Sequence, residues 1–175
     1  MDERLSQKEV INYVLDELVN RNLLKKNIST YKNTESLLYK YPSLKKSIED
    51  REEEIEYIKK YGFDKIRNST SIVKMSTNLT NQKDYDIDEE MIRSITRDVH
   101  KIKLVINRID RVLKKFKDDK YIDIIRLKYF EGKTQEEIAE YFEKDYSTLW
   151  RNNKRLINEI KIYFFPNDVI EEIKS

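Results

Sequence analysis

Apolar residues recur at helical spacing along most of the chain, and the strongest pattern lies in its third quarter. Eight apolar residues there step alternately by three and four positions: Ile92, Ile95, Val99, Ile102, Ile106, Ile109, Leu113 and Phe116. More than three heptads of such residues predict a long helix over 88–117 whose apolar seam is covered by another helix. The covering helix is either an earlier helix of the same chain or the same helix of a second subunit, and the spacing leaves that choice open.

A shorter heptad seam comes before it. Its residues are Leu37, Tyr41, Leu44, Ile48, Arg51, Ile55 and Ile58. Pro42 interrupts this seam early, so we expect the long front helix to begin near Pro42 as a first-turn proline, after a shorter helix, and to end at Gly62. Arg51 places a charge on the seam, which weakens the seam or fixes its register.

The chain begins with another amphipathic stretch. Ser6 and Glu9 form a capping-box pattern ahead of apolar residues at helical spacing, which predicts a helix over 6–26. We expect it to pack on the rest of the protein, and docking onto a partner is the alternative. The stretch 62–87 is rich in Ser, Thr and Asn and predicts a linker. The predicted organisation is an N-terminal helical region (1–61), the linker (62–87), the long heptad helix (88–117) and a C-terminal unit (118–175).

The C-terminal unit contains a pattern typical of two helices joined by a tight turn. An apolar helix over 121–130 precedes it and ends at Gly132. Thr134 and Glu137 then form a capping box that opens the first of the two helices, and Asp145 can cap the second. Ala139 supplies a small side chain where the two helices are expected to cross. The predicted fold is therefore all-α, with long heptad helices and a C-terminal helix-turn-helix.

The second of these helices, over 146–161, divides into two faces. Apolar residues lie on one face: Leu149, Leu156 and Ile160. Polar, basic and aromatic residues lie mostly on the other: Tyr146, Ser147, Trp150, Arg151, Lys154 and Arg155. A helix that enters the DNA major groove needs this division, because one face anchors it while the other offers hydrogen-bond donors and flat groups to bases and phosphates. The alternative is an ordinary amphipathic hairpin with solvated charges.

Each residue of the outer face has an expected role in binding double-stranded DNA. The planar guanidinium of Arg151 matches the O6 and N7 acceptors of guanine. Tyr146 and Ser147 lie at the helix start, where they can touch phosphates or bases. Lys154 and Arg155 are expected to hold the phosphate backbone. Trp150 is expected either to touch DNA or to pack against the preceding helix.

The composition supports helices and excludes several classes of site. The 175 residues include two Gly and two Pro, and 39% are charged, which favours long helices over sheets. No Cys and a single His (His100) argue against disulfides, metal sites and catalytic triads. No nucleophile with a base and no phosphate-binding loop appears, so we expect no enzyme activity and no cofactor. No signal peptide or spanning apolar run appears either, so we expect a cytoplasmic, nucleoid-associated protein without a membrane partner.

The charge is unevenly distributed. Residues 101–163 contain 16 Lys or Arg and 11 Asp or Glu, an excess of +5, whereas the rest of the chain carries −3. The basic excess therefore coincides with the predicted DNA-reading helix, as phosphate binding requires.

Two stretches resemble known families. The order RLKYFEGKTQEEIAEYFEKDYSTLWRNNKRLINEI resembles the region-four helix-turn-helix of sigma factors. The front stretch NISTYKNTESLLYKYPSLKKSIEDREEEI, followed by a Ser/Thr-rich linker and a second long helix, is similar to the ArpU/RinA group of phage transcriptional regulators. The resemblance covers about residues 28–165.

The resemblance implies activation of phage late genes through promoter binding, with the host RNA polymerase as a possible further partner. The contacting positions of the family fall on Tyr146, Ser147, Trp150, Arg151 and Arg155. Asn152 departs from the pattern, because sigma-like helices usually bury an apolar group there. Asp145 stands where Ser or Thr is common. Both departures bear on the exact set of DNA contacts.

The regular seam over 92–116 makes a homodimer or higher oligomer an expected partner arrangement, and a dimer reads two half-sites.

Three other functions remain open from the sequence. A DNA-packaging recognition subunit, similar to a small terminase, also pairs a helix-turn-helix with an oligomerising coil. A compact alternative sigma factor needs a promoter-melting domain, in place of which the front half has heptads. A coiled-coil adaptor without a DNA role predicts no salt-dependent DNA binding.

Overall fold

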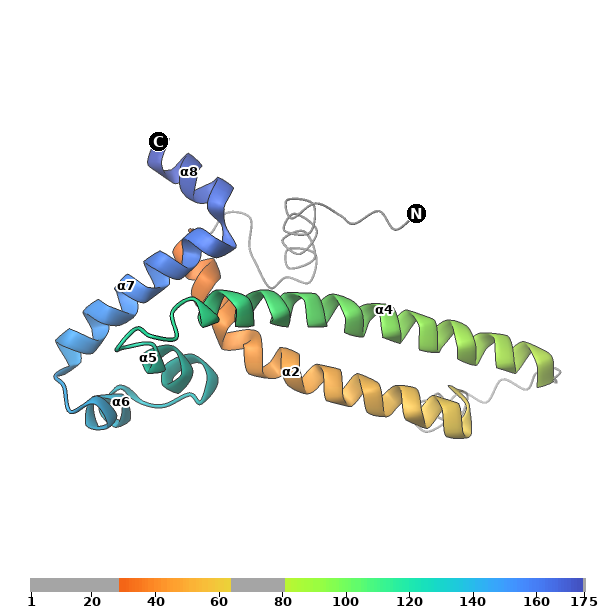
Figure 1. Ribbon diagram of the computed structural model, residues 1–175. Helices are drawn as coiled ribbons and strands as arrows, with labels where there is room; N and C mark the ends of the chain where they lie inside the picture. The colour runs from red at the N-terminus through yellow and green to blue at the C-terminus, as the bar shows by residue number, and fades with distance from the viewer. Residues whose placement is uncertain (1–28, 64–80, 175) are drawn as a thin grey trace. The chain divides into compact units, whose positions relative to one another are not determined.

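The computed structural model describes residues 29–63 and 81–174, which form helices joined by turns and short connections (Figure 1). The helices are α2 (Thr30–Tyr61), α4 (Asn81–Lys114), α5 (Asp123–Ile125), the π-helix η1 (Arg126–Phe130), α6 (Gln135–Phe142), α7 (Tyr146–Phe164) and α8 (Pro166–Lys174). The all-α prediction is confirmed. The predicted helix over 6–26 and most of the predicted linker lie outside the described residues. None of the described helices is long and apolar enough to cross a membrane.

Two compact units share the long helices. One unit combines the residues up to Ser43 with those from Val105 onwards, and the other is Leu44–Leu104. The predicted boundaries at 61, 87 and 117 do not coincide with this division. The physical reason is that α2 and α4 each bury apolar residues in both units, so each helix contributes to two separate cores.

The Leu44–Leu104 unit is a helical hairpin in which α2 and α4 run alongside each other (Figure 1). Its core contains Ile58, Ile95 and Val99, with partly buried apolar residues of both helices packed around them. In this unit the seam is covered by a helix of the same chain, which is one of the two arrangements left open above. Arg51 is paired across the hairpin with Asp98 at 3.5 Å, so the charge on the seam has a partner.

Helix α2 runs unbroken through Pro42, so the prediction of a helix that begins near Pro42 is wrong. A proline inside a helix removes one hydrogen bond and costs about 3 kcal/mol. Leu37 and Leu38 before the proline and Leu44 after it are all buried. Each contributes about 1.5–3 kcal/mol by burial, so together they outweigh the cost of the proline. Apolar burial on both sides therefore keeps one helix.

Helix α4 begins at Asn81, seven residues before the predicted start, and ends at Lys114 rather than at residue 117. Residues 81–87 are thus helical and not part of a linker. Near the C-terminal end of α4 the buried positions move from the predicted Leu113 to Val112. A straight helix has 3.6 residues per turn, so a strict heptad drifts around its surface.

Gly62 ends α2 as predicted, with a φ of +79° that favours glycine. The Phe63 amide donates to Asp88 Oδ1 at 2.7 Å, and a Cβ at Gly62 would lie 3.3 Å from Asp88 Oδ2. Glycine therefore permits both the left-handed turn and the close approach of the α4 carboxylate.

The core of the other unit holds the C-terminal helices on α2 and α4. Its most deeply buried side chains are Thr34, Leu37, Leu38, Ile109, Val112, Ile125, Leu156, Ile157 and Ile160. The predicted helix over 121–130 is present as the short α5 followed by the wider η1, in which the Glu131 amide donates to the Arg126 carbonyl at 3.0 Å. Gly132 follows with a φ of +65°. The unit thus places α5, η1, α6 and α7 around one core.

Candidate nucleic-acid interface

Helices α6 and α7 are joined by the residues Glu143, Lys144 and Asp145 and pack on a common apolar cluster. The cluster consists of Ile124, Leu127, Ile138 and Leu149, with Tyr121, Ala139 and Phe142 partly buried against it. The predicted capping box opens α6: the Glu137 amide donates to Thr134 Oγ1 at 3.2 Å, and the Thr134 amide donates to Glu137 Oε2 at 2.8 Å. The small Ala139 lies in this cluster, as the crossing of two helices requires.

The turn between α6 and α7 uses a strained residue. Glu143 has a φ of +50° and is the one non-glycine residue of the described ranges with a positive φ. The Lys144 amide donates back to the Ala139 carbonyl at 3.2 Å, which closes the end of α6. The turn is followed directly by Asp145, the N-cap residue of α7.

Asp145 caps α7 through its side chain. Its Oδ1 accepts from the Thr148 amide at 2.9 Å and from the Ser147 hydroxyl at 2.5 Å, and its Oδ2 accepts from the Thr148 hydroxyl at 2.7 Å. These bonds, first that from Ser147 and then those from Thr148, hold the pKa of Asp145 well below its ordinary value. The departure from Ser or Thr at this position therefore supplies an ionised cap.

The two faces of α7 are divided as expected. The buried residues are Leu149, Asn153, Leu156, Ile157, Ile160 and Phe164. The exposed residues of its first half are Tyr146, Ser147, Trp150, Arg151 and Lys154. The rings of Tyr146 and Trp150 belong to residues that are each 51% exposed, so five of the six predicted contact residues share one open surface.

Arg151 is oriented by the first turn of its own helix. Its Nε donates to the Ser147 carbonyl at 3.2 Å, and its Nη2 lies 3.5 Å from the Ser147 hydroxyl oxygen. The Ser147 hydroxyl proton points to Asp145. The Ser147 hydroxyl is therefore engaged within the helix, and the outer edge of the guanidinium is left toward solvent.

Trp150 and Lys154 form a second pair on this surface. The Lys154 ammonium lies 5.3 Å from the centroid of the Trp150 ring, a cation–π distance. Trp150 also lines a pocket with residues of α5, η1 and α6, so it both packs within the helical unit and keeps half of its surface open.

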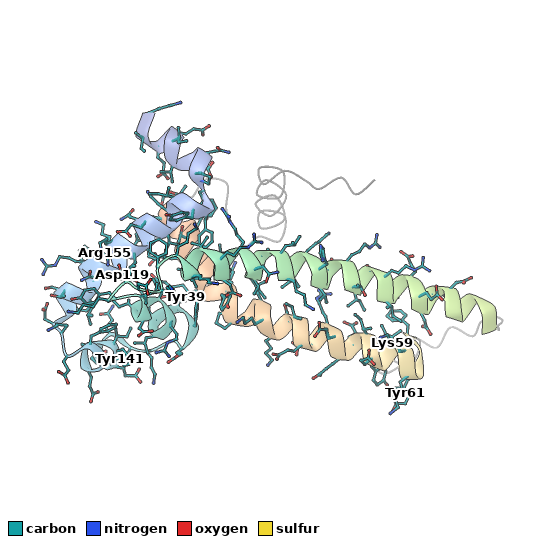
Figure 2. All side chains as sticks on the ribbon, in the orientation of Figure 1. Tyr39, Lys59, Tyr61, Asp119, Tyr141 and Arg155 are labelled. Carbon is teal, nitrogen blue, oxygen red and sulfur yellow. The ribbon has the colours of Figure 1, made fainter. Side chains whose placement is uncertain are left out.

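Arg155 differs from the other predicted contacts because it is held by carboxylates. Its guanidinium lies 2.9 Å from Asp119 Oδ2 and 3.0 Å from Glu159 Oε1, and Figure 2 shows it directed toward Asp119. Asp119 also accepts from the Tyr121 amide at 2.9 Å. The pair therefore ties the middle of α7 to the turn that follows α4, and the phosphate role assigned to Arg155 competes with two ion pairs.

A buried polar network behind α7 was not predicted. Asn153 is 6% exposed, and its Oδ1 lies 3.2 Å from the Tyr129 hydroxyl, which also lies 2.7 Å from Glu35 Oε1. Burial, and next the bond to Glu35, raise the pKa of Tyr129, so it stays a neutral donor. Asn153 is spaced at helical intervals from Leu149 and Leu156, so it lies in the apolar stripe of α7. This spacing was the sequence signal from which a buried polar contact could have been predicted. Asn152, the residue singled out from the sequence, instead donates to the Thr148 carbonyl at 2.9 Å.

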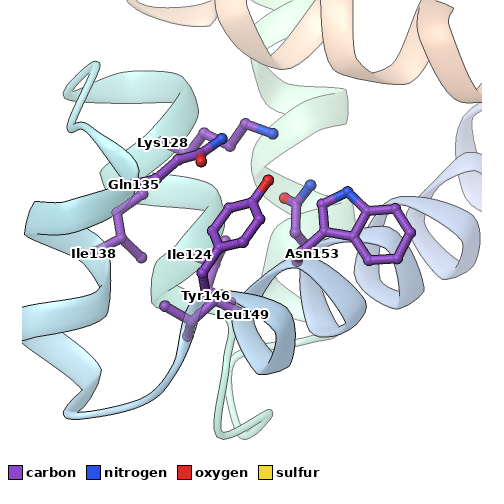
Figure 3. A pocket seen from close by; sticks show the side chains of 8 residues that line it. Ile124, Lys128, Gln135, Ile138, Tyr146, Leu149 and Asn153 are labelled. Carbon is purple, nitrogen blue, oxygen red and sulfur yellow. The ribbon is translucent and has the colours of Figure 1, made fainter.

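A pocket opens between α5, η1, α6 and α7 (Figure 3). It is open to solvent, has a volume of about 40 Å³ and is lined by Ile124, Lys128, Gln135, Ile138, Tyr146, Leu149, Trp150 and Asn153. In the described ranges, no group of three or more acidic or histidine side chains is placed to hold a metal ion.

Comparison with known proteins gives no relative from which a role can be transferred. No family model matches the chain. No curated protein and no solved structure matches it either. The function is therefore argued from the residues of this surface.

Proposed function

We propose that this protein is a sequence-specific, double-stranded-DNA-binding transcription regulator that inserts α7 into the major groove. The observation that supports the proposal most is the open surface of α7, where Tyr146, Ser147, Trp150, Arg151 and Lys154 are exposed while the opposite face is buried in the core. Arg151 reads a guanine through the outer edge of its guanidinium. Lys154 contacts a phosphate.

The sequence resemblance extends this proposal to the biological role. Similarity to sigma region four and to ArpU/RinA regulators favours an activator of phage late genes that acts at promoters, with RNA polymerase as a further partner. The excess of +5 charges in residues 101–163 favours binding to promoter DNA.

A homodimer belongs to the same proposal, because two copies of α7 would read two half-sites. The seam residues Ile95, Val99, Ile102, Ile106 and Ile109 are buried within their own chain. A dimer through residues 92–116 would therefore have to exchange helices between chains. Sedimentation equilibrium measures the oligomer directly, and a ring-shaped oligomer in native mass spectrometry would favour the DNA-packaging alternative.

The test of DNA binding begins with selection of a preferred site from a random duplex library. Fluorescence anisotropy then compares the wild type with Arg151→Ala on the selected duplex and on a scrambled one. We expect Arg151→Ala to weaken binding to the selected duplex by about 5- to 150-fold, because a bidentate guanine contact contributes about 1–3 kcal/mol of discrimination. Binding to the scrambled duplex should change much less.

Arg93→Ala is the matched control, because it also removes one exposed arginine but from the Leu44–Leu104 unit, where Arg93 pairs with Glu89 at 2.6 Å. It should leave the sequence preference unchanged. Equal losses in both variants would mean that Arg151 acts only as a charge. Absence of any salt-dependent DNA binding would favour the adaptor alternative.

A further inference from the structure

We infer that three lysines in the turns between α4 and α5 form a second phosphate-binding site beside α7. These residues, called the lysine cluster below, are Lys115, Lys117 and Lys120. All three are exposed and belong to the same compact unit as α7, so one core positions them and the helix together. The site rests on the proposed function and deepens it, because it supplies the residues that hold the DNA backbone.

Helix α7 by itself offers few cations to a DNA backbone. Arg155 is bound to two carboxylates, which leaves Arg151 and Lys154 as the exposed cations of the open α7 surface. Arg151 is assigned to a guanine, so Lys154 is left as the single phosphate contact. About half to two-thirds of the hydrogen bonds in protein–DNA interfaces go to phosphate and sugar. Further cations therefore have to come from other parts of the unit.

Helix α6 does not supply these cations. The first helix of a helix-turn-helix usually crosses the DNA backbone, yet α6 contains Glu136, Glu137 and Glu140 and no Lys or Arg. The preceding Lys133 lies 2.8 Å from Glu137 Oε1, so its charge is already paired. Residues 123–145 contain seven acidic and four basic residues. The charge on this side of α7 therefore disfavours phosphates.

The turns that carry the lysine cluster lie along the other edge of the open α7 surface. Asp119 Oδ2 lies 2.9 Å from the Arg155 guanidinium, and Figure 2 shows the two side chains directed toward one another. Farther along α7, the rings of Phe116 and Tyr163 are 5.7 Å apart. The turns therefore accompany α7 from Arg155 to Tyr163, about 12 Å of helix. Arg151 lies one turn before Arg155, so the lysine cluster continues the edge that carries Arg151.

Two lysines of the cluster are oriented by aromatic rings. The Lys115 ammonium lies 5.1 Å from the centroid of the Tyr163 ring, and the Lys120 ammonium lies 5.5 Å from that of Tyr121. A cation–π contact orients an ammonium group without neutralising its charge. Among the residues that the structure describes, neither lysine has a carboxylate partner. Both therefore keep a full charge and free N–H donors for a phosphate.

The surroundings of the cluster are also positive. Lys117 pairs with Asp118 at 4.0 Å, but both side chains are well exposed, and a pair of this kind contributes little. The other acidic residue of these turns is already bound to α7. On the preceding turns of α4, Arg108 and Arg111 are close neighbours: burial, and next the charge of Arg111, lower the pKa of Arg108. Like charges gathered in this way attract a polyanion.

The dimensions of the cluster match a DNA strand. Successive phosphates of one strand advance by about 3.4 Å along the duplex, so an edge of about 12 Å accompanies about three of them. With α7 in the major groove, the cluster binds the strand that borders the groove on the Arg151 side. The α6 side lacks comparable cations, so the contact with the backbone extends along one flank.

The test compares two variants that each replace three exposed lysines by glutamine. The first changes the cluster: Lys115→Gln, Lys117→Gln and Lys120→Gln. The matched control changes three lysines of the Leu44–Leu104 unit: Lys46→Gln, Lys59→Gln and Lys60→Gln. Lys60 lies 5.0 Å from the Tyr61 ring centroid, so the control also loses a cation–π contact. Both full-length variants should retain the thermal unfolding midpoint of the wild type.

Fluorescence anisotropy measures binding to the selected and the scrambled duplex over a range of salt concentrations. We expect the cluster variant to bind both duplexes about tenfold or more weakly and to reduce the slope of log K against log salt by about 2.7, because three phosphate contacts are lost. Its preference for the selected duplex should remain, since the cluster reads no base. The control should keep the slope of the wild type. An unchanged slope in the cluster variant, or equal losses in both variants, would overturn the inference.

Hydroxyl-radical footprinting of the selected duplex locates the contact. The wild type should protect the backbone beyond one flank of the bound groove, and the cluster variant should lose protection of that flank alone. Protection that is the same in both proteins would overturn the inference. Loss of binding to phosphatidylserine vesicles with DNA binding intact would also overturn it and assign the cluster to a membrane surface.

Failure of the proposed function gives a different result. A wild type that binds all duplexes equally, with the salt slope still reduced in the cluster variant, would overturn sequence-specific reading by α7 and leave the lysine cluster as a phosphate site. A wild type that prefers one duplex, with a cluster variant of unchanged salt slope, would overturn the cluster alone.

Discussion

Single side chains on α7 are held in place by short-range bonds within the first helical turns. Asp145 accepts from Ser147 and Thr148, and Ser147 in turn accepts from Arg151. Under the proposed DNA binding, Ser147 would therefore orient Arg151, because its own hydroxyl is engaged within the helix. These bonds order exposed side chains of α7 within their own helix, which would reduce the entropy lost in the proposed DNA binding.

The ionised cap makes a prediction about acid stability. Because the folded pKa of Asp145 is depressed below its ordinary value of 3.8, its contribution is fully present above that value and is lost as the pH falls toward the folded pKa. Asp145→Asn keeps a capping oxygen without a charge, so its free energy of unfolding should fall less than that of the wild type between about pH 4 and pH 2. Urea unfolding at each pH measures this difference.

Asp118→Asn is the control for that measurement, because Asp118 makes a single ion pair, at 4.0 Å with Lys117, on the surface. It measures how an Asp-to-Asn change at an exposed position away from the helix cap affects the same curves. Parallel curves for Asp145→Asn and the wild type would show that the cap does not contribute in this way.

Arg155 and Lys154 are adjacent, but substituting them should affect different properties: folding stability for Arg155 and DNA binding for Lys154. Arg155→Ala removes two ion pairs and should lower the free energy of unfolding by about 1 kcal/mol or less, with little change in the salt dependence of DNA binding. Lys154→Ala should barely alter stability and should reduce the slope of log K against log salt by about 0.9. A reduced salt slope in the Arg155→Ala variant would instead support the phosphate contact that the sequence predicts for Arg155.

At the scale of elements, the turn between α6 and α7 stores strain. Glu143 adopts a left-handed backbone that costs a non-glycine residue about 1–2 kcal/mol. Glu143→Gly should therefore raise the free energy of unfolding by about 1 kcal/mol, which thermal and urea unfolding can measure. Lys144→Gly at the next position, where φ is negative, should instead lower it by about 0.5–1 kcal/mol. A loss of stability in both variants would contradict the strain.

The long helices show that the bounds of a helix do not follow from one local residue or from local composition alone. Pro42 ends a helix by local rules, yet α2 continues because apolar side chains on both sides of it are buried. Asn81–Ile87 contains few apolar residues, yet it extends α4. Predictions from local composition therefore misplaced the start of α2 and the start of α4. Heptad spacing predicted the presence of both helices correctly.

At the scale of the molecule, two cores divide the chain. Ile58 belongs to the cluster of the Leu44–Leu104 unit, and Leu149 belongs to the cluster beneath α6 and α7. Ile58→Ala should cost about 2–5 kcal/mol and speed amide exchange within that hairpin first, with DNA affinity retained below the unfolding temperature. Leu149→Ala should cost as much and abolish DNA binding. Identical exchange patterns in the two variants would show that the cores unfold as one.

The sequence by itself determined the helical class, both heptad helices, the capping box at Thr134, the Asp145 cap and the division of α7 into two faces. These features depend on residues within a few positions of one another, so the spacing of residue types along the chain is enough to predict them. Only the tertiary structure decided that α2 covers the seam of α4, that Arg155 pairs with Asp119, and that Asn153 meets Tyr129. The pocket joins side chains that are up to 29 positions apart, from Ile124 to Asn153. Contacts between distant residues depend on how helices pack, and a one-dimensional pattern does not contain that information.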